Sequence, residues 1–375
     1  MIPREIYEET LLSYFAPIRP FLDDPQVSEV MINGPSQIYV ERKGCIERVE
    51  ASFVNREALV AALRNLSQYI GKAVDETNPI LEGRLPDGSR VEAVLPPVSP
   101  DGPSVAIRRF ARETLTIDRL VRFGAMSELV ARTLEALVVA KINIFVAGGT
   151  GSGKTSLLNA LSGFIPPTER VVVIEDTREV QMQRAHYVQL EARAADPRGR
   201  GAVSIRDLFR ATLRLRPDRV IVGEIRGGEA LDILQAMTSG HGGCMGTLHA
   251  TYPRDTLTRL ETMAMMSDVE LPLAALRVQI GSGLQCIVQV SRLRDGSRKV
   301  THVTEVAGYD LATQTYLLRD LFVREYQGLD THSNVQSEIV PTGVLPTFLP
   351  QLLEHGVTLP EELTAAATLK AGSHV

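Results

Sequence analysis

The sequence is poor in cysteine and in aromatic residues, and both shortages exclude kinds of protein. The three cysteines, Cys45, Cys244 and Cys286, lie far apart and form no CxxC pair, so the sequence predicts neither a zinc finger nor a thioredoxin-type site. Tryptophan is absent and aromatic residues make up 5% of the chain, which leaves little material for base-stacking platforms. Few, scattered cysteines are typical of a reducing compartment.

The sequence also has no excess of positively charged residues over negatively charged ones. Lysine and arginine number 40 against 45 aspartate and glutamate residues, a net charge of −5, whereas nucleic-acid-binding domains are usually basic. We therefore expect no nucleic acid as a partner. The N-terminus does not resemble a secretion signal, and the most apolar stretch, residues 134–147, is too short and too interrupted by charge to span a bilayer. These features predict a cytoplasmic protein.

The chain has the length and apolar content of a folded protein with more than one domain. Its 375 residues, 44% hydrophobic and 23% charged, suggest two or three domains. We expect a small α+β domain at 1–110, a polar and basic hinge at 111–125, and a core at 126–325. In the core, apolar strands alternate with helices, which is typical of a mainly parallel sheet covered on both faces. Residues 326–375 read as a tail, a polar connector with one short helix at 345–353.

The individual elements follow from periodicity and turn residues. In the first domain we expect helices at 4–23, bent by Pro17 and Pro20, and at 56–70, with strands at 29–32, 37–41, 45–49, 89–94 and 104–110. In the core we expect strands at 142–147, 170–175, 187–191, 219–224 and 243–249, and a hairpin at 287–293 and 299–306. Core helices are expected at 127–140, 155–164, 205–215, 228–237 and 256–266.

The strongest feature is the run IFVAGGTGSGKTSLLNAL, which has the context of a phosphate-binding loop. An apolar strand precedes it, a helix follows it, and its glycines let backbone N–H groups turn inward around a β-phosphate. Lys154 should bridge the β- and γ-phosphates, and the Thr155 hydroxyl should ligate Mg²⁺. No guanine-reading Asn/Thr-Lys-x-Asp motif follows, which disfavours GTP. The expected nucleotide-binding residues are Gly148, Gly149, Thr150, Gly151, Ser152, Gly153, Lys154, Thr155 and Ser156.

Carboxylates stand at the ends of two further strands. VVVIEDTREV places Glu175 and Asp176 where a strand ends, with Glu179 one turn on, and RPDRVIVGEIRGGEA places Glu224 at the end of another. Ligands bind at this edge of open α/β sheets. One carboxylate near Mg²⁺ and another that polarises water form the minimum set for hydrolysis. Each can also be a solvated turn residue.

Histidines and arginines supply further candidates. His241 and His249 flank a strand in SGHGGCMGTLHA, whose glycines suit a segment that senses a γ-phosphate, although either can be structural. A row of arginines that includes Arg210 lies on one face of a predicted helix. These arginines either form ion pairs on a solvated surface or reach a phosphate in the same or a neighbouring subunit. The same two readings apply to the remaining candidates, Arg108, Arg109 and Arg226.

Together these motifs resemble the secretion and type IV pilus assembly ATPases. GGTGSGKT, VIEDTREV, RPDRVIVGEIRGGEALDILQAMTSGH and GTLHA match, in order, that family's phosphate loop, aspartate box, second acidic box and histidine box. Within the family the chain looks closest to the tight-adherence (Flp) pilus ATPases of the CpaF/TadA type, on VSEVMINGPSQIYVERKG, RDTLTRLETM and VSRLRDGSRKVTHVTEVAGYD. The resemblance covers most of residues 25–310. GHGGCMGTLHATYP departs from that subgroup, which tends to have an acidic residue after the first histidine.

The resemblance implies a fold and a cellular setting. The fold is α/β, a RecA-like P-loop ATPase core with a smaller N-terminal α+β, sensor-like domain. The protein would form a homohexamer that is cytoplasmic, peripheral to the inner membrane, and that drives an inner-membrane platform protein in pilus assembly or secretion. Two alternatives stay open: a conjugative or effector type IV secretion ATPase, and a scaffold that binds ATP without hydrolysing it.

The resemblance also implies roles for the candidate residues. With ATP and Mg²⁺ bound, Glu175 helps to position the attacking water, while Thr155 and Glu224 serve the metal. His241 and His249 couple the state of the γ-phosphate to domain closure. The arginines that would contact phosphate or a neighbouring subunit are Arg108, Arg109, Arg210 and Arg226.

Overall fold

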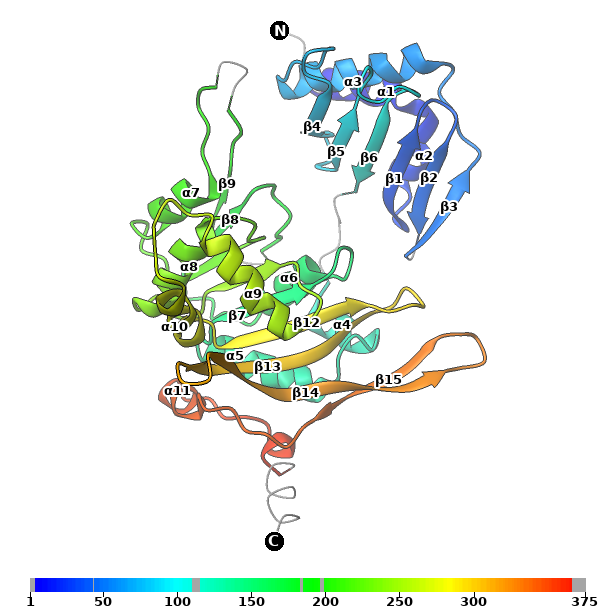
Figure 1. Ribbon diagram of the computed structural model, residues 1–375. Coiled ribbons are helices and arrows are strands. Elements are labelled where there is room, and N and C mark those ends of the chain that lie inside the picture. The colour runs from blue at the N-terminus through cyan, green and yellow to red at the C-terminus, as the bar shows by residue number, and fades with distance from the viewer. Residues whose placement is uncertain (1–3, 43, 110–114, 183–184, 196–198, 366–375) are drawn as a thin grey trace. The chain divides into compact units, whose positions relative to one another are not determined.

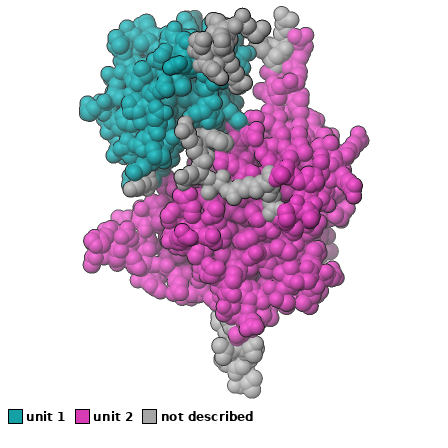
Figure 2. Space-filling view, turned by 180° about the vertical axis from the view of Figure 1, so that it is seen from behind, with its two compact units in different colours: residues 1–113 teal, residues 114–375 magenta. Residues whose placement is uncertain are grey.

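The structure is a computed structural model that describes residues 4–42, 44–109, 115–182, 185–195 and 199–365. The chain divides into two compact units, residues 1–113 and 114–375 (Figure 2). The division falls inside the segment predicted as a hinge, but part of that segment is helical. Among the described residues, no helix is long and apolar enough to cross a membrane.

The first unit is a six-stranded antiparallel sheet with helices packed on it. Its strand order is β3-β2-β1-β6-β5-β4, and its core joins the sheet to α1 and α3 (Figure 1). Its elements are α1 Arg4–Tyr14, η1 Ala16–Ile18, α2 Arg19–Asp23, β1 Val27–Asn33, β2 Ile38–Arg42, β3 Cys45–Val49, α3 Arg56–Ile70, β4 Ile80–Arg84, β5 Arg90–Val94 and β6 Ser104–Arg108. The prolines break the helix predicted at 4–23 into three pieces, and β4 was missed.

The second unit is built on a nine-stranded sheet in the order β15-β14-β13-β12-β7-β11-β10-β8-β9. The strands from β12 to β9 in that order are parallel, and β12 to β15 are antiparallel. Its elements are α4 Ile117–Arg122, α5 Glu128–Val139, β7 Ile144–Gly148, α6 Lys154–Ser162, β8 Val171–Glu175, β9 Tyr187–Glu191, α7 Ile205–Thr212, β10 Arg219–Val222, α8 Glu229–Thr238, β11 Met245–Leu248, α9 Pro253–Ala264, α10 Leu273–Gly283, β12 Cys286–Arg292, β13 Arg298–Asp310, β14 Thr315–Leu329, β15 Val335–Pro341 and α11 Leu349–Glu354.

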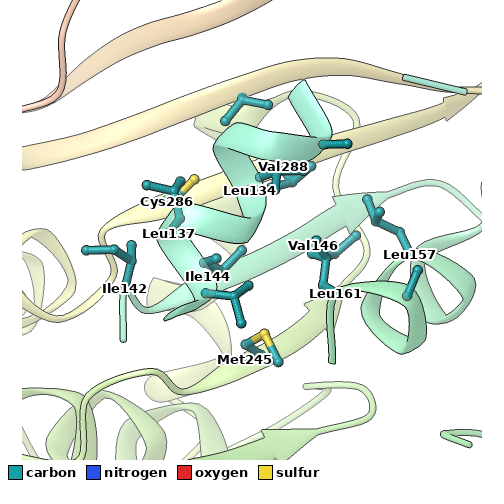
Figure 3. Packing of buried hydrophobic residues seen from close by; sticks show 14 of the residues in the cluster. Leu134, Leu137, Ile142, Ile144, Val146, Leu157, Leu161, Met245, Cys286 and Val288 are labelled. Carbon is teal, nitrogen blue, oxygen red and sulfur yellow. The ribbon is translucent and has the colours of Figure 1, made fainter. Parts of the chain in front are cut away.

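The central strand β7 shows why this sheet needs a cover on each side. All five of its residues are buried. Ile144 and Val146 belong to a core shared with α5 and α6, whereas Phe145 and Ala147 belong to a second core shared with α8, α9 and α10. Figure 3 shows the first of these cores, with Leu134 and other side chains gathered around β7. The predicted α/β fold, with a smaller N-terminal α+β part and a larger, mainly parallel part, is confirmed.

The sheet continues past residue 325, where the sequence predicted that the core ends. β14 runs unbroken to Leu329, and β15 pairs with it through residues 335–341. Most of β15 is only partly covered, so its sequence lacks the apolar alternation of a buried strand. Because the side chains of such a strand are polar, the sequence predicted a connector there. Helices α4 and α10 were also missed.

Candidate active site

The phosphate-binding loop lies between β7 and α6, as predicted. Gly151 and Gly153 have φ angles of 67° and 96°, which other residues rarely adopt. Gly148 lies so close to the neighbouring strand that a Cβ atom would be 2.4 Å from the Val290 carbonyl oxygen. The loop therefore requires glycine at two kinds of position, where its backbone has a positive φ and where it packs closely against the neighbouring strand.

Four predicted side chains, which follow three different strands, meet beside this loop. Lys154 Nζ, at the start of α6, lies 3.4 Å from His249 Nδ1 and donates to the Gly149 carbonyl at 3.0 Å. His249 Nε2 lies 2.7 Å from Glu224 Oε1. Arg226 Nη2 donates to the other oxygen of Glu224 at 2.5 Å. Because β7, β11 and β10 are parallel neighbours, the residues at their carboxyl ends gather at one edge of the sheet.

The charges around His249 favour its neutral form. Burial lowers the pKa of His249, and the positive charge of Lys154 lowers it further, against the opposing effect of the Glu224 carboxylate. A neutral imidazole can donate one hydrogen bond and accept another. His249 can therefore link Glu224 to whatever occupies the phosphate loop.

Glu175 is buried and fully engaged by its own chain. One carboxylate oxygen accepts hydrogen bonds from the backbone N–H groups of Glu179 (2.8 Å) and Val180 (2.7 Å), and the other accepts from Gln189 Nε2 at 2.6 Å. Burial raises the pKa of Glu175, against the lowering effect of these hydrogen bonds. In this arrangement Glu175 anchors the turn after β8, and its predicted contact with the attacking water stays a prediction.

The turn after β8 also brings the Glu179 carboxylate to Thr155, the predicted Mg²⁺ ligand. The Thr155 hydroxyl donates to Glu179 Oε2 at 3.4 Å. The described residues contain no cluster of three or more histidine, cysteine, aspartate or glutamate side chains that could hold a metal ion by itself. The hydroxyl of Thr155 and the carboxylates of Glu179 and Glu224 are nevertheless the hard oxygen donors that suit Mg²⁺, which keeps water and substrate phosphates as its other ligands.

His241 is not among the residues that meet at the loop. It precedes β11 whereas His249 follows it, so the two histidines flank opposite ends of the strand. Next to His241, a Cβ atom on Gly242 would contact the Lys141 carbonyl oxygen, on the segment that enters β7 rather than leaves it. Its predicted role in sensing the γ-phosphate stays a prediction.

The remaining predicted arginines are engaged elsewhere. Arg210 Nε donates to Asp232 Oδ1 on α8 at 3.2 Å. Arg108 and Arg109 belong to the first unit. The guanidinium of Arg109 donates to the backbone carbonyls of Asp24 and Val27. Contacts of these arginines with phosphate or with a neighbouring subunit stay predictions.

Sequence reasoning missed an arginine that touches the loop. Arg298, the first residue of β13, donates from Nε to the Gly151 carbonyl at 2.8 Å, and its Cδ would lie 3.4 Å from a Cβ atom on Gly153. It reaches the loop because β12 pairs with β7, with Val290 opposite Gly148. The run SRLRDGSRKV holds several basic residues around a turn, but only the strand order says that this turn lies beside the phosphate loop.

Comparison with known proteins adds three findings. The profile of the family described as Type II/IV secretion system protein matches residues 12–319. The chain is 34% identical over 292 residues to the conjugal transfer protein TrbB of Rhizobium radiobacter (77% of this chain, 86% of the relative), and 35% identical over 299 residues to the type IV secretion system protein PtlH of Bordetella pertussis (73% and 88%). It also resembles the crystal structure of the pilus retraction motor PilT with bound ADP, with a TM-score of 0.54 at 18% identity, over 96% of this chain and 88% of that one. At that identity the likeness concerns the fold.

Proposed function

The chain belongs to the Type II/IV secretion system protein family, and on this premise we propose that it is a Mg²⁺-dependent ATPase that powers a type IV secretion or conjugal transfer machine. The observation that carries the proposal is the meeting of Lys154, Glu224 and His249 at the phosphate loop. Hydrolysis of a nucleoside triphosphate requires a positive charge that reaches the β- and γ-phosphates and a carboxylate or similar group that orients the attacking water, and Lys154 and Glu224 supply both there.

Each residue has a part in the proposed reaction. The backbone N–H groups of the loop and the N-terminus of α6 hold the phosphates, and Lys154 stabilises the charge that develops on them. The Thr155 hydroxyl and the carboxylates of Glu224 and Glu179 would hold Mg²⁺, which would supply positive charge to the phosphates.

In this proposal Glu224 polarises the attacking water in place of Glu175, whose two carboxylate oxygens already accept hydrogen bonds from Glu179, Val180 and Gln189. Arg226 and His249 hold the Glu224 carboxylate in place. His249 leaves Glu224 for the γ-phosphate when ATP is present, which reports the nucleotide state.

The relatives favour type IV secretion over the tight-adherence subgroup that the sequence motifs suggested. TrbB and PtlH carry the names conjugal transfer protein and type IV secretion system protein, and each matches about three quarters of this chain. The tight-adherence assignment rests on short motif stretches alone. Relaxase and coupling-protein genes beside the gene for this chain would support the proposal, whereas pilin and prepilin-peptidase genes would restore the tight-adherence reading.

Family membership also supports the proposed assembly. The working form would be a homohexamer at the cytoplasmic face of the inner membrane, where it drives a membrane-embedded platform protein. His241, Arg108, Arg109 and Arg210 are the residues proposed to act in domain closure or across subunits.

The test is Mg²⁺-dependent phosphate release by the purified full chain. We expect Lys154→Ala and Glu224→Gln each to lower turnover by about 100-fold or more, since one removes charge stabilisation and the other the proton-accepting carboxylate. Glu325→Gln, at an exposed carboxylate of β14, is the matched control and should leave turnover unchanged. Undiminished turnover in both site variants would refute the mechanism. Nucleotide binding with no turnover in the wild type would identify the non-hydrolysing scaffold.

A further inference from the structure

Gln289, on β12, has a buried amide that holds the segment following β11. The residue is 1% exposed. Its Nε2 donates to the backbone carbonyl of Ala250 at 3.0 Å and to that of Thr251 at 3.1 Å. These two residues directly follow His249, in the connection from β11 to α9. The amide therefore fixes the backbone of the segment that carries His249.

The register of the sheet explains how the amide reaches this segment. β7 lies between β12 and β11, and Gln289, Ala147 and Leu248 are paired in one row across the three strands. Side chains paired in this way lie on the same face of a sheet. The Ala147 side chain, in the middle of the row, is only a methyl group. The longer side chain of Gln289 can therefore extend across β7 to the residues that follow Leu248.

Gln289 is a polar side chain in an apolar core. Its neighbours on this face of the sheet, Phe145 and Ile287, are buried and apolar. Its Oε1 is buried and has no hydrogen-bond partner among the described residues, which costs stability. The opposite orientation of the amide would direct this oxygen at two carbonyl oxygens. The contribution of the amide is therefore its pair of hydrogen bonds to the segment after His249.

Gln289 can hold that segment because its own strand is held on both sides. β12 pairs with β7 on one side and with β13 on the other. Beyond β13, the buried guanidinium of Arg324, on β14, donates to the Val300 carbonyl at 2.8 Å and to the Ala125 carbonyl at 3.1 Å. A donor on such a rigid strand fixes the group it binds more precisely than a donor on a loop does.

His249 depends on its backbone for its position. Its side chain is 37% exposed, so packing holds it only in part. The imidazole lies 3.4 Å from Lys154 Nζ and 2.7 Å from Glu224 Oε1. The first distance is near the limit of a hydrogen bond, so a shift of a few tenths of an ångström would break that contact.

We infer that Gln289 is a positioning residue for His249: its amide, reaching across β7, fixes the backbone after β11 so that the imidazole lies between Lys154 and Glu224. The effect on turnover rests on the proposed function, because it assumes that His249 acts at the γ-phosphate. Arg298 of the same β12–β13 hairpin donates to the phosphate loop. One hairpin would then hold both the loop and the histidine segment.

The first test is ATP hydrolysis by the full chain with Gln289→Met, which keeps an unbranched side chain of similar length but has no N–H donor. We expect kcat to fall by about tenfold or more, since misplacement by about 1 Å can cost about 100-fold. KM for MgATP should stay unchanged, because the phosphate loop is intact. Gln289→Asn, whose amide is one methylene shorter, should act in the same direction. Ile287→Val, a small change on the same face of β12, is the control and should leave kcat unchanged.

A double-variant cycle with His249→Gln separates positioning from general destabilisation. If Gln289 acts through His249, adding Gln289→Met to His249→Gln should lower kcat no further. Equal losses in the two backgrounds would overturn the inference, and so would an undiminished kcat in Gln289→Met.

A crystal structure of Gln289→Met tests the inference apart from the proposed function. We expect the contact between His249 and Glu224 to be lost, and an imidazole in its original place would overturn the inference. If the wild type does not hydrolyse ATP but the imidazole moves in Gln289→Met, the proposed function fails and the positioning role of Gln289 stands.

Discussion

Replacing Glu175 separates an anchoring role from a catalytic one. Its carboxylate accepts two backbone N–H groups and the amide of Gln189, and it has no spare room, since a Cβ atom on Gly223 would come within 2.7 Å of its Cγ. Glu175→Gln keeps the shape and one acceptor oxygen. Glu175→Ala removes every acceptor and leaves a void.

The structure sets the size of each effect on stability. In Glu175→Ala, the N–H groups of Glu179 and Val180 lose their partner, and each such buried donor costs about 1–3 kcal/mol. With the void added, we expect the free energy of unfolding to fall by about 4 kcal/mol. In Glu175→Gln the remaining oxygen still accepts both N–H groups. The Gln189 amide can turn its unpartnered oxygen toward the new NH₂ group, at the expense of its hydrogen bond to the Val180 carbonyl, so the expected loss is about 1–2 kcal/mol.

Urea unfolding and phosphate release, measured on the same samples, decide between the roles. If Glu175 positions water, Glu175→Gln should lower turnover by about 100-fold despite its small effect on stability. Full turnover in Glu175→Gln would refute the catalytic role and leave the anchoring role. Equal destabilisation by the glutamine and the alanine would instead refute the hydrogen-bond reasoning.

The same variant gives a pH signature. Burial raises the pKa of Glu175 above its ordinary value of 4.5, so the folded protein binds this proton more tightly than the unfolded chain does. The group therefore contributes stability below pH 4.5, and that contribution is lost as the pH rises through the raised pKa. We expect Glu175→Gln to cost more stability at acidic pH than at neutral pH.

Two further predictions concern other parts of the second unit. Gly243→Ala should lower the free energy of unfolding by about 1–3 kcal/mol more than Gly240→Ala, as measured by thermal unfolding. Both glycines have a positive φ, but only at Gly243 would the new Cβ atom meet the buried Arg219 guanidinium. Equal losses in the two variants would contradict this reasoning. Burial and Lys154 lower the pKa of His249 below its ordinary value of 6.5 in the folded protein. As the pH falls through 6.5, the His249 imidazole is therefore protonated more readily in the unfolded chain than in the folded protein, and the free energy of unfolding should fall. His249→Gln should reduce this acid sensitivity in urea unfolding measured from pH 7.5 to 5, and an unchanged slope would argue against it.

The sequence predicted the parts of the site that depend on strand ends. Lys154, Glu224 and His249 follow three apolar strands, and parallel strands bring such residues to one edge. The sequence also allows the prediction that His241 lies away from His249, because a residue that precedes a strand lies at the opposite edge of the sheet from one that follows it. The contact of Arg298 with the loop could not be predicted in this way, because it depends on β12 lying beside β7, and local periodicity does not reveal the order of strands in a sheet.

The same limit explains the elements that were missed. β15 is a partly covered edge strand, whose polar side chains resemble those of a loop, and its pairing with β14 is what makes it a strand. Helix α4 is short, with one buried residue, Leu120, so its apolar periodicity is weak. In both cases tertiary contacts determine the structure, and a single sequence does not display them.

The guanidinium of Arg324 has a practical consequence for dividing this chain into fragments. The family profile ends at residue 319, in the middle of β14, five residues before Arg324. A fragment cut at that limit would lose residues 320–329 of β14, which include the partners of His302, Val303 and Thr304 on β13. It would also lose the buried side chains of Leu321 and Phe322, and the Arg324 guanidinium that donates to the Ala125 and Val300 carbonyls. Expression of the second unit should therefore extend through α11, and boundaries drawn from sequence similarity alone would yield a misfolded or aggregating product.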